Sequence, residues 1–295
     1  MLYKDFIFSD EIGSIREKMS ISDFERRDYH FGEKDLAALN YLAILWNGID
    51  SIKLTKNPGG QFDHIMVDEA QDLSPFEIYV LYMISGTGSI TMLGDMNQAI
   101  RTYRSIQSWD EATNILKEHI HNINVEVFDL SVAYRSTGEI VKVCNKLIQK
   151  EAKFVFRIGE SPKVEKIVSA TEGIDKIMRS VLDFQEKAKT EKLSIGVISK
   201  TLDGCLYLQE KLQVGLPTEI SVNLMSNSAD KLESGVTILP AILSKGLEFD
   251  AVIIANANSE HFQETELDRK ILYVCMSRAR YLFPIYYSTD LTPHL

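Results

Sequence analysis

The sequence predicts an α/β protein built on parallel β-sheets, because strand-like and helix-like segments alternate and polar residues follow the strands. Residues 64–67 form a short, mostly apolar run that ends in Asp68 and Glu69. A helical segment covers 75–84, and a second apolar run at 90–93 is again followed by polar residues. This order is typical of an α/β sheet whose functional site lies at the carboxyl edge of its strands.

The same alternation begins again near residue 125, where we place the boundary between two domains. Before it, apolar residues at helical spacing predict a helix within 36–46, which Gly48 ends. The second half is expected to contain strands at 125–130, 192–199, 235–241, 250–256 and 282–288, and helices at 136–150 and 206–214. The stretch 159–173 has no clear pattern.

Composition narrows the class of protein. The chain has 295 residues, 45% of them hydrophobic and 25% charged, as is usual for soluble globular proteins. It contains no apolar run of the roughly 18–20 residues that a membrane span needs and no secretory leader pattern, so we expect a cytoplasmic protein. A net charge of −10 argues against coating nucleic acid through a broad basic surface. The charge is compatible with a narrow binding site for a single nucleic-acid strand, or with docking on a basic protein partner.

The three cysteines indicate neither a disulfide framework nor a zinc site. Cys144, Cys205 and Cys275 lie far apart in the sequence and form no CxxC pair. We expect them to be reduced and buried.

The two acids after the first strand are candidates for magnesium chemistry. Asp68 and Glu69 stand side by side at a rigid strand end, so one carboxylate could hold the ion while the other accepts a proton from an attacking water. Asp95 and Gln98 follow the next strand, and Gln98 could sense a terminal phosphate. An acidic pair by itself is more often a solvated surface feature, but the apolar run before this one favours a site.

An aromatic residue and a cation follow these polar residues. Tyr103 and Arg104 are suited to stacking a base and holding a backbone phosphate, although an isolated tyrosine is more often part of a core.

The acids and the segment after them resemble motifs II and III of the UvrD/Rep helicases of superfamily 1: DEAQD is followed by GDxxQ, an aromatic residue and an arginine. Three later segments continue the family's order. LSVAYRSTGEI resembles motif IV, SKGLEFDAVII resembles motif V, and DRKILYVCMSRAR resembles motif VI. The resemblance is strongest over 63–146 and 236–287.

The resemblance implies roles for residues of these later motifs. Tyr134 would pack on adenine, while Arg135 and Arg278 would reach the γ-phosphate, Arg278 as an arginine finger. Lys245, Gly246 and Glu248 would lie near the cleft between the two domains, with Gly246 and Glu248 at the nucleotide and the glutamate on the ribose, and Asp95 would also belong to the site.

The resemblance also implies an architecture. Two RecA-like parallel-sheet domains are expected, an incomplete one over 1–124 with motifs II and III and a complete one over 125–295 with motifs IV to VI. ATP with Mg²⁺ would be bound between them, and single-stranded DNA is the expected partner of the intact motor.

One element of the family is absent from the sequence. No GxxxxGK[ST] occurs, which is the loop and lysine that hold the β- and γ-phosphates. We therefore expect weak or absent ATP binding by this chain alone, and a fragment or split protein whose other half carries the loop. The segment TILPAILSKGLEFD and the short separation of motifs IV and V resemble the helicase IV (HelD-like) relatives that recycle stalled RNA polymerase more closely than they resemble repair helicases.

Two alternatives remain at this point. The motifs could persist only as scaffold in a degenerate fragment, with Asp68, Glu69 and the arginines pairing with one another. The chain could also be a catalytically inactive docking module that binds RNA polymerase or a separate lysine-loop half.

Overall fold

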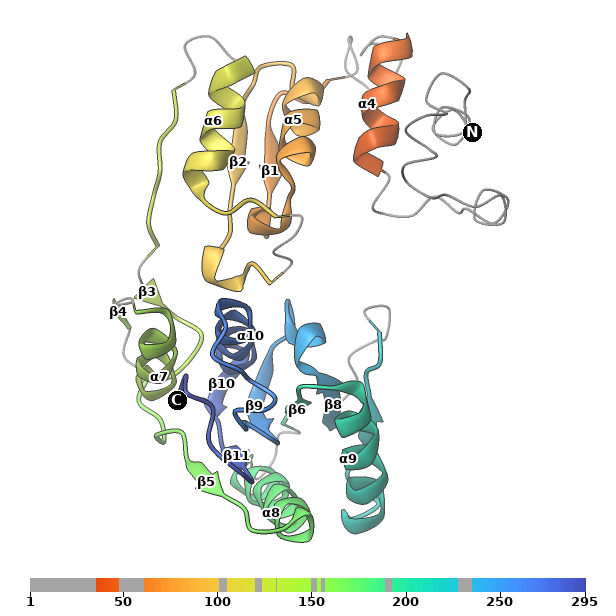
Figure 1. The fold of residues 1–295 in the computed structure, drawn as a ribbon, viewed down its shortest axis with the longest axis vertical. Coiled ribbons are helices and arrows are strands. Elements are labelled where there is room, and N and C mark those ends of the chain that lie inside the picture. Colours follow the sequence, from red (N-terminus) through yellow and green to blue (C-terminus); the bar gives the residue numbers. More distant parts are fainter. Residues whose placement is uncertain are drawn as a thin grey trace, which may run out of the picture. The chain divides into compact units, whose positions relative to one another are not determined.

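The computed structural model describes part of the chain as two compact units. The described residues are 36–47, 61–100, 105–119, 124–130, 132–149, 153–154, 157–188, 193–227 and 235–295. Unit 1 consists of Met1–Met96 and Arg101–Glu126, and unit 2 consists of Asn97–Ile100 and Val127–Leu295. Both units contain parallel strands covered by helices (Figure 1). The predicted α/β class with parallel sheets is therefore confirmed.

Unit 1 contains two parallel strands and three α-helices among its described residues. Its elements are α4 (Leu36–Asn47), β1 (Ile65–Val67), η4 (Ala70–Asp72), α5 (Pro75–Ile84), β2 (Ile90–Met92) and α6 (Trp109–His119), and η5 (Met96–Gln98) crosses into unit 2. Strands β1 and β2 pair with Ile65 opposite Ile90. Helices α5 and α6 pack on a small core that includes Ile78, Ile106 and Leu116.

Helix α5 begins and ends at the predicted residues, and local sequence signals set its start. Ser74 is the N-cap, and its hydroxyl accepts a hydrogen bond from the Glu77 backbone N–H at 3.2 Å. The Glu77 carboxylate in turn accepts from the Ser74 backbone N–H at 2.7 Å, which completes a capping box. Pro75 at the first helical position needs no hydrogen-bond acceptor for its nitrogen.

Unit 2 is built on a seven-stranded parallel sheet in the order β5-β11-β9-β6-β8-β7, with β10 pairing with β9 on the same side as β11. Its elements are β3 (Val132–Ala133), α7 (Gly138–Ile148), β4 (Lys153–Phe154), β5 (Val164–Lys166), α8 (Ala170–Ala188), β6 (Ile195–Ser199), α9 (Leu202–Gly215), β7 (Val222–Leu224), β8 (Val236–Pro240), η6 (Ala241–Ser244), β9 (Phe249–Ile254), α10 (Glu266–Ser277), β10 (Ala279–Leu282) and β11 (Ile285–Tyr287).

Helices cover both faces of this sheet, so unit 2 has three layers. On one face, α7 and α10 pack against strand residues such as Leu239 and Val252. On the other face, α8 and α9 pack against residues such as Val197 and Ile253. The central strands β6, β8 and β9 are almost continuously apolar because both of their faces are buried.

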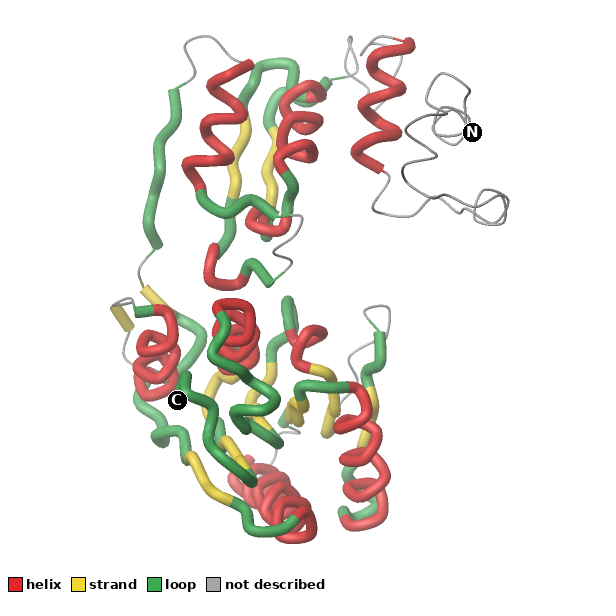
Figure 2. Tube along the Cα trace, viewed as in Figure 1, coloured by secondary structure: helices red, strands yellow, loops and turns green. Residues whose placement is uncertain are grey.

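One predicted strand is wrong. The described residues 124–130 form no regular structure (Figure 2), and Val127, Phe128 and Leu130 are exposed. Their apolar and polar alternation suits a strand, but no described strand is paired with them, and β propensity is realised only where a sheet provides partners. The paired strand comes later, at β3.

One helix boundary differs from the prediction, and one stretch without a prediction contains regular structure. Helix α9 starts before residue 206 because the Thr201 hydroxyl accepts a hydrogen bond from the Gly204 backbone N–H at 3.2 Å. The unassigned stretch 159–173 contains β5 and the first residues of α8.

The prediction for the cysteines is confirmed. Cys144, Cys205 and Cys275 are free and buried. Burial raises the pKa of the Cys144 thiol to about 12 and those of Cys205 and Cys275 to about 11.

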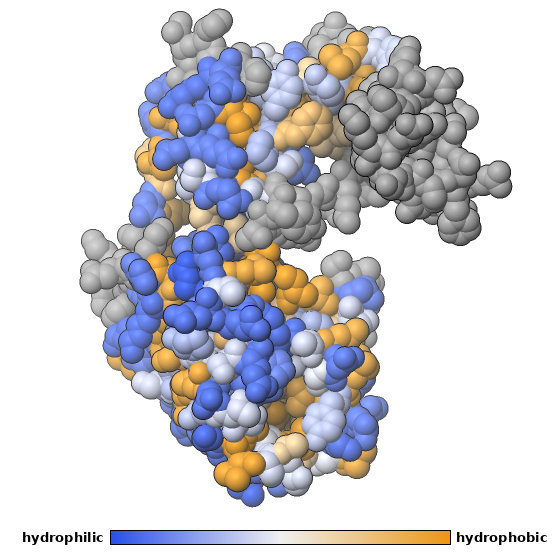
Figure 3. Space-filling model, viewed as in Figure 1, coloured by the Kyte–Doolittle hydropathy of each residue, from blue (hydrophilic) through white to orange (hydrophobic). Residues whose placement is uncertain are grey.

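The visible surface of the described part mixes hydrophilic and hydrophobic side chains (Figure 3). Among the described helices, none has both the length and the apolar character needed to cross a membrane.

Candidate nucleotide site

The predicted acids of unit 1 follow two paired strands and lie at the same edge of the sheet. Beyond the strands the ladder continues, since the Leu93 N–H donates to Val67 O and the Ala70 N–H donates to Leu93 O, both at 2.8 Å. Asp68 and Glu69 therefore lie close to the segment that carries Asp95, at the carboxyl ends of β1 and β2.

Gln71 connects these acids. Its side-chain NH₂ donates to the Glu69 carboxylate, and its side-chain oxygen accepts from the Asp95 backbone N–H at 3.1 Å. Gln71 is fully buried, and a Cβ added at Gly94 would lie 2.1 Å from its side-chain oxygen. Glu69 itself has φ 52° and ψ 35°, a left-handed conformation that costs a non-glycine residue about 1–2 kcal/mol. Strained residues cluster at functional sites, although Gln149, which has a similar φ of 51°, only ends helix α7.

The carboxylates of Asp68 and Glu69 fit a magnesium site only together with other oxygen ligands. The described residues contain no group of three or more His, Cys, Asp or Glu side chains that could hold a metal ion by themselves. Mg²⁺, however, is usually held by one or two carboxylates together with water and substrate phosphates. Asp68 and Glu69, of which Asp68 accepts the Glu69 backbone N–H at 2.8 Å, are two such carboxylates.

In unit 2, a loop between β3 and α7 is anchored to the start of β10. The Ser136 hydroxyl donates to Ala279 O at 2.6 Å, and the Thr137 N–H donates to Arg280 O at 3.2 Å. The Gly138 N–H donates to Arg157 O at 2.9 Å. These bonds bring three distant segments of the chain to one place.

A pocket of about 590 Å³ opens where these segments meet, and six side chains line it: Tyr134, Arg135, Arg157, Glu248, Arg280 and Tyr281. It lies at the amino ends of β9 and β10 and next to the end of β3, unlike the acids of unit 1, which lie at carboxyl strand ends. Three arginines against one glutamate leave an excess of positive charge, and two tyrosines supply aromatic rings. The lining thus suits a ligand with a flat ring and negative charge.

An ion-pair network orders the pocket. The two oxygens of the Glu248 carboxylate are shared, Oε1 with Arg135 at 2.7 Å and Oε2 with Arg280 at 3.2 Å. Arg280 also reaches Asp250 at 3.7 Å. Arg157 donates to the main-chain oxygen of Arg135 at 3.0 Å.

The two tyrosines of the pocket differ in surroundings. Tyr134 is 71% exposed, so its ring is open to a ligand. Tyr281 is less open, at 45% exposed, and the Arg157 guanidinium lies 5.8 Å from the centre of its ring.

Two further predicted residues, Gln98 and Arg278, meet in a second cluster of unit 2. Arg278 is 3% exposed and donates to the side-chain oxygen of Gln98 at 2.7 Å. It also donates to Val274 O at 3.0 Å. The Lys245 ammonium donates to the main-chain oxygen of Gln98 at 2.8 Å. Gln98, which follows β2 in the sequence, belongs by its contacts to unit 2.

Gly246 lies in the turn between η6 and β9. Its φ is 78°, in the left-handed region, and an added Cβ would have no heavy atom within 4 Å. The positive φ of the turn, and not steric crowding around a Cβ, therefore favours glycine at this position.

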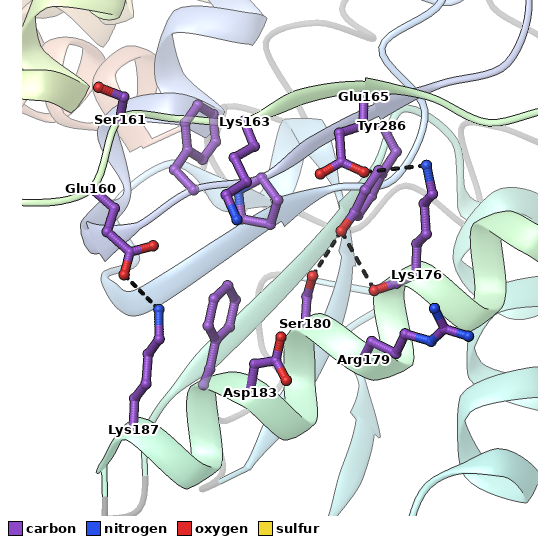
Figure 4. Close-up of a pocket in the computed structure, with 13 residues that line it drawn as sticks. Glu160, Ser161, Lys163, Glu165, Lys176, Arg179, Ser180, Asp183, Lys187 and Tyr286 are labelled. Carbon is purple, nitrogen blue, oxygen red and sulfur yellow. Dashed lines mark hydrogen bonds and ion pairs between the residues drawn. The ribbon is translucent and has the colours of Figure 1, made fainter.

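A second cavity, of about 250 Å³, lies beside α8 and the β5 and β11 edge of the sheet (Figure 4). Two of its four cationic side chains are paired with acids: Lys187 with Glu160 at 2.5 Å, and Lys176 with Glu165 at 3.2 Å. The buried Tyr286 hydroxyl is hydrogen bonded to Ser180 at 2.7 Å. This cavity is smaller and more nearly neutral, so it suits a nucleotide less well.

The structure thus places the predicted residues in three groups. Tyr134, Arg135 and Glu248 share the pocket, Gln98 and Arg278 share a hydrogen bond, and the acids of unit 1 are joined through Gln71. The base-stacking prediction for Tyr103 and Arg104 lies outside the described residues.

Sequence reasoning missed four residues of these groups. Gln71 was given no role, although it stands between the predicted acids. Arg280 ends the segment DRKILYVCMSRAR and Tyr281 directly follows it, so their position was a usable signal. Arg157 had no signal at all, because only the fold brings it to the pocket.

Comparison with known proteins supports this arrangement of motifs. Residues 25–119 match the model of the UvrD/REP helicase N-terminal domain, and residues 236–282 match the model of the UvrD-like helicase C-terminal domain. The two matches follow the order of the family. This chain belongs to the UvrD-like helicases of superfamily 1.

Among similar proteins, the UvrD-like chain is 31% identical over 120 residues to DNA helicase II of Haemophilus influenzae, covering 39% of this chain and 16% of that protein. It is 21% identical over 276 residues to the ATP-dependent DNA helicase Rep of Buchnera aphidicola, covering 90% of this chain and 40% of that protein. It is also 25% identical over 173 residues to the mitochondrial ATP-dependent DNA helicase HMI1 of Saccharomyces cerevisiae, covering 57% and 23%. The chain therefore spans less than half of each relative's length.

Among the solved structures that are similar to part of the UvrD-like chain is a helicase domain. It is the C-terminal domain of a possible DNA helicase from Lactobacillus plantarum WCFS1, at 30% identity and a TM-score of 0.45, covering 55% of this chain and 91% of that one.

Proposed function

We propose that this UvrD-like chain is the part of an ATP-dependent DNA translocase that supplies acids and arginines to an ATP site, while the phosphate-binding lysine loop is supplied from outside this sequence. The observation that carries the proposal is the pocket of unit 2, because three residues expected at the nucleotide line one cavity. UvrD-like helicases use ATP and Mg²⁺ and act on nucleic acid, and the relatives named above are DNA helicases.

In this proposal the pocket binds the nucleotide through its ring and its charge. The exposed ring of Tyr134 stacks on the base, and Glu248 accepts a hydrogen bond from a ribose hydroxyl. Arg135, whose side chain is 51% exposed, moves from Glu248 to a phosphate. A bound phosphate competes well for this arginine because an exposed ion pair contributes only about 0–1 kcal/mol.

The acids of unit 1 act on the metal and on the attacking water. Asp68 and Glu69 would hold Mg²⁺, which when bound neutralises charge on the phosphates. The buried Gln71 side chain holds the Glu69 carboxylate through its hydrogen bond. A carboxylate held in this way is suited to accept the proton of the attacking water.

Arg278 and Gln98 contribute to the same reaction. Both are proposed to contact the γ-phosphate, and their mutual hydrogen bond of 2.7 Å supports a common location. In the described conformation the Arg278 guanidinium is buried and bonded to Gln98. To act as an arginine finger, the guanidinium would donate to a phosphate oxygen in place of the Gln98 oxygen or together with it.

The test is nucleotide binding by the whole chain. We expect weak binding of the fluorescent analogue N-methylanthraniloyl-ATP, measured by titration into the millimolar range, and no phosphate release by the chain alone, with or without single-stranded DNA. Tyr134→Ala should weaken the binding, whereas Tyr207→Ala, which removes a partly exposed tyrosine from α9, should not. Equal binding by the wild-type chain and Tyr134→Ala would refute the assignment of the pocket.

Turnover is tested by adding a separately produced half that carries a lysine loop. Glu69→Gln and Arg278→Ala should each abolish the phosphate release that the combined halves show. Normal turnover in either variant would overturn the corresponding role.

A second candidate function, the inactive docking module, is favoured by one observation. Met66 on β1 is 69% exposed and Leu93 after β2 is 41% exposed, so apolar side chains of unit 1 are accessible to a partner. Stable binding of RNA polymerase or of a lysine-loop half without nucleotide would favour this function. The likeness to helicase IV relatives and the DNA contacts of Tyr103 and Arg104 stay predictions.

A further inference from the structure

We infer that Arg280 is a positioning residue of the nucleotide pocket: it keeps Glu248 neutralised, so that Arg135 can leave this carboxylate for a phosphate of the ligand. The inference rests on the proposed function, because it takes the pocket of unit 2 as the nucleotide site. It assigns a role to a residue that lines the pocket and was not among the expected nucleotide contacts.

The first step is that one carboxylate holds two arginines. Arg135 bonds to Oε1 of Glu248 at 2.7 Å, and Arg280 bonds to Oε2 at 3.2 Å. If Arg135 turned to a phosphate, Glu248 would keep an ion pair with Arg280. The movement therefore leaves no unpaired carboxylate in the pocket.

The second step is that a further acid lies close by. Asp250 is 3.7 Å from Arg280, and its carboxylate is held in place by the Ser194 backbone N–H at 3.0 Å and the Ser194 hydroxyl at 2.8 Å. Without Arg280, Asp250 would lose this cation, and Glu248 would have Arg135 as its one remaining ion-pair partner among the described residues of the pocket. Arg135 would then be held more strongly and released less easily.

The third step decides which arginine moves. Arg280 lies in strand β10, and its main-chain oxygen accepts the Thr137 N–H at 3.2 Å. Arg135 lies in the loop between β3 and α7, and its side chain is 51% exposed. The Arg280 side chain is nearly as exposed, at 45%, but it is paired with both Glu248 and Asp250. Among the described ion pairs Arg135 has Glu248 alone as its partner, so Arg135 is the arginine that can leave at the smaller cost.

A purely structural role for Arg280 makes a different prediction. If Arg280 only stabilised unit 2, its removal would weaken every ligand of the pocket equally, whatever residue stood at position 248. If it acts through Glu248 on Arg135, its removal should matter only for ligands that carry phosphate, and only while the carboxylate is present.

The experiment measures displacement of N-methylanthraniloyl-ATP from the full chain by ATP and by adenosine. We expect Arg280→Ala to weaken ATP binding about three- to fivefold, the effect of losing up to about 1 kcal/mol of favourable charge interaction. Adenosine binding should be unchanged, and Arg280→Lys should recover most of the ATP affinity. Arg179→Ala is the matched control, because it removes one positive charge from an exposed position of α8.

The decisive arm uses the Glu248→Gln background. There, adding Arg280→Ala should change ATP affinity by less than about 1.5-fold, because no carboxylate holds Arg135. A loss of about threefold or more in that background, or an equal loss for adenosine, would overturn the inference while leaving the pocket as the nucleotide site. No detectable binding of the analogue by the wild-type chain would overturn the proposed site and the inference together.

Discussion

Replacing Gly94 with alanine would test whether the buried Gln71 side chain holds the acids of unit 1 in place. The added methyl group would lie 2.1 Å from the Gln71 side-chain oxygen and 3.2 Å from its backbone nitrogen. Gln71 would have to move, and its hydrogen bonds to Glu69 and to the Asp95 backbone would be lost. Gly94 does not have a positive φ, so the backbone itself tolerates alanine.

The expected loss of stability follows from these contacts. Overpacking of a tight site costs about 1–3 kcal/mol. Each lost hydrogen bond of a buried polar side chain adds about 1 kcal/mol, and lower entropy of the unfolded chain returns about 0.4–1 kcal/mol. We therefore expect Gly94→Ala to lower the free energy of unfolding of unit 1 by about 2–4 kcal/mol.

Tryptophan fluorescence gives a selective assay for unit 1. The chain has two tryptophans, Trp46 and Trp109, and both belong to this unit. Trp109 packs against its core, so its emission should change when the unit unfolds in urea. Gly86→Ala gives the comparison for a milder contact, because Gly86 is exposed and its added Cβ would lie 3.1 Å from the Gln61 Cβ, which is tight but less close than the 2.1 Å at Gly94. It should therefore cost clearly less than Gly94→Ala.

A double-mutant cycle separates the proposed clash from other causes. Gln71→Ala removes the side-chain atoms that the methyl group added at position 94 would strike, so Gly94→Ala should cost less than about 1 kcal/mol in that background. A loss of less than about 0.5 kcal/mol for Gly94→Ala alone would refute the reasoning, as would an equal loss with and without Gln71.

Three further predictions concern unit 2 and the cysteines. Gly235→Ala should lower the midpoint of thermal unfolding, measured by circular dichroism, far more than Gly246→Ala. Gly235 has φ 107° and its added Cβ would lie 2.6 Å from a backbone oxygen of Ser221, whereas Gly246 has open space around it. The buried cysteines, whose raised pKa values keep them as thiols, should react with a disulfide reagent at about pH 8 only after denaturation; rapid reaction of the native chain would contradict this. The hydrogen bond from Lys187 lowers the pKa of Glu160, so this pair stabilises the fold above pH 4.5 and its contribution is lost as the pH falls through the lowered pKa. Carbon-13 NMR titration should show the Glu160 pKa rise in Lys187→Met, and an unchanged value would refute the pairing.

The elements that the sequence predicted well are those with strong local signals. Helix α5 has a capping box and a proline at its start, and both patterns lie within a few residues of one another. The almost wholly apolar strands β6, β8 and β9 likewise show their burial directly in the sequence. The strand predicted at 125–130 was wrong. A sequence pattern shows only that a segment is able to form a strand, and no described strand pairs with this one.

For the candidate site, sequence order alone determined the family and the residue types expected at the nucleotide: the acids after β1, Tyr134 with Arg135, and Arg278. Motifs of this kind are contiguous, so they can be recognised without a fold. The tertiary structure decided which side chains share a space. It joined Arg157 and Arg280 to a pocket across 22 and 32 residues of sequence, through contacts with Arg135 and Glu248 respectively. Such convergence depends on how the strands and loops pack, because the partners of a charged side chain are set by distance in space and not along the chain.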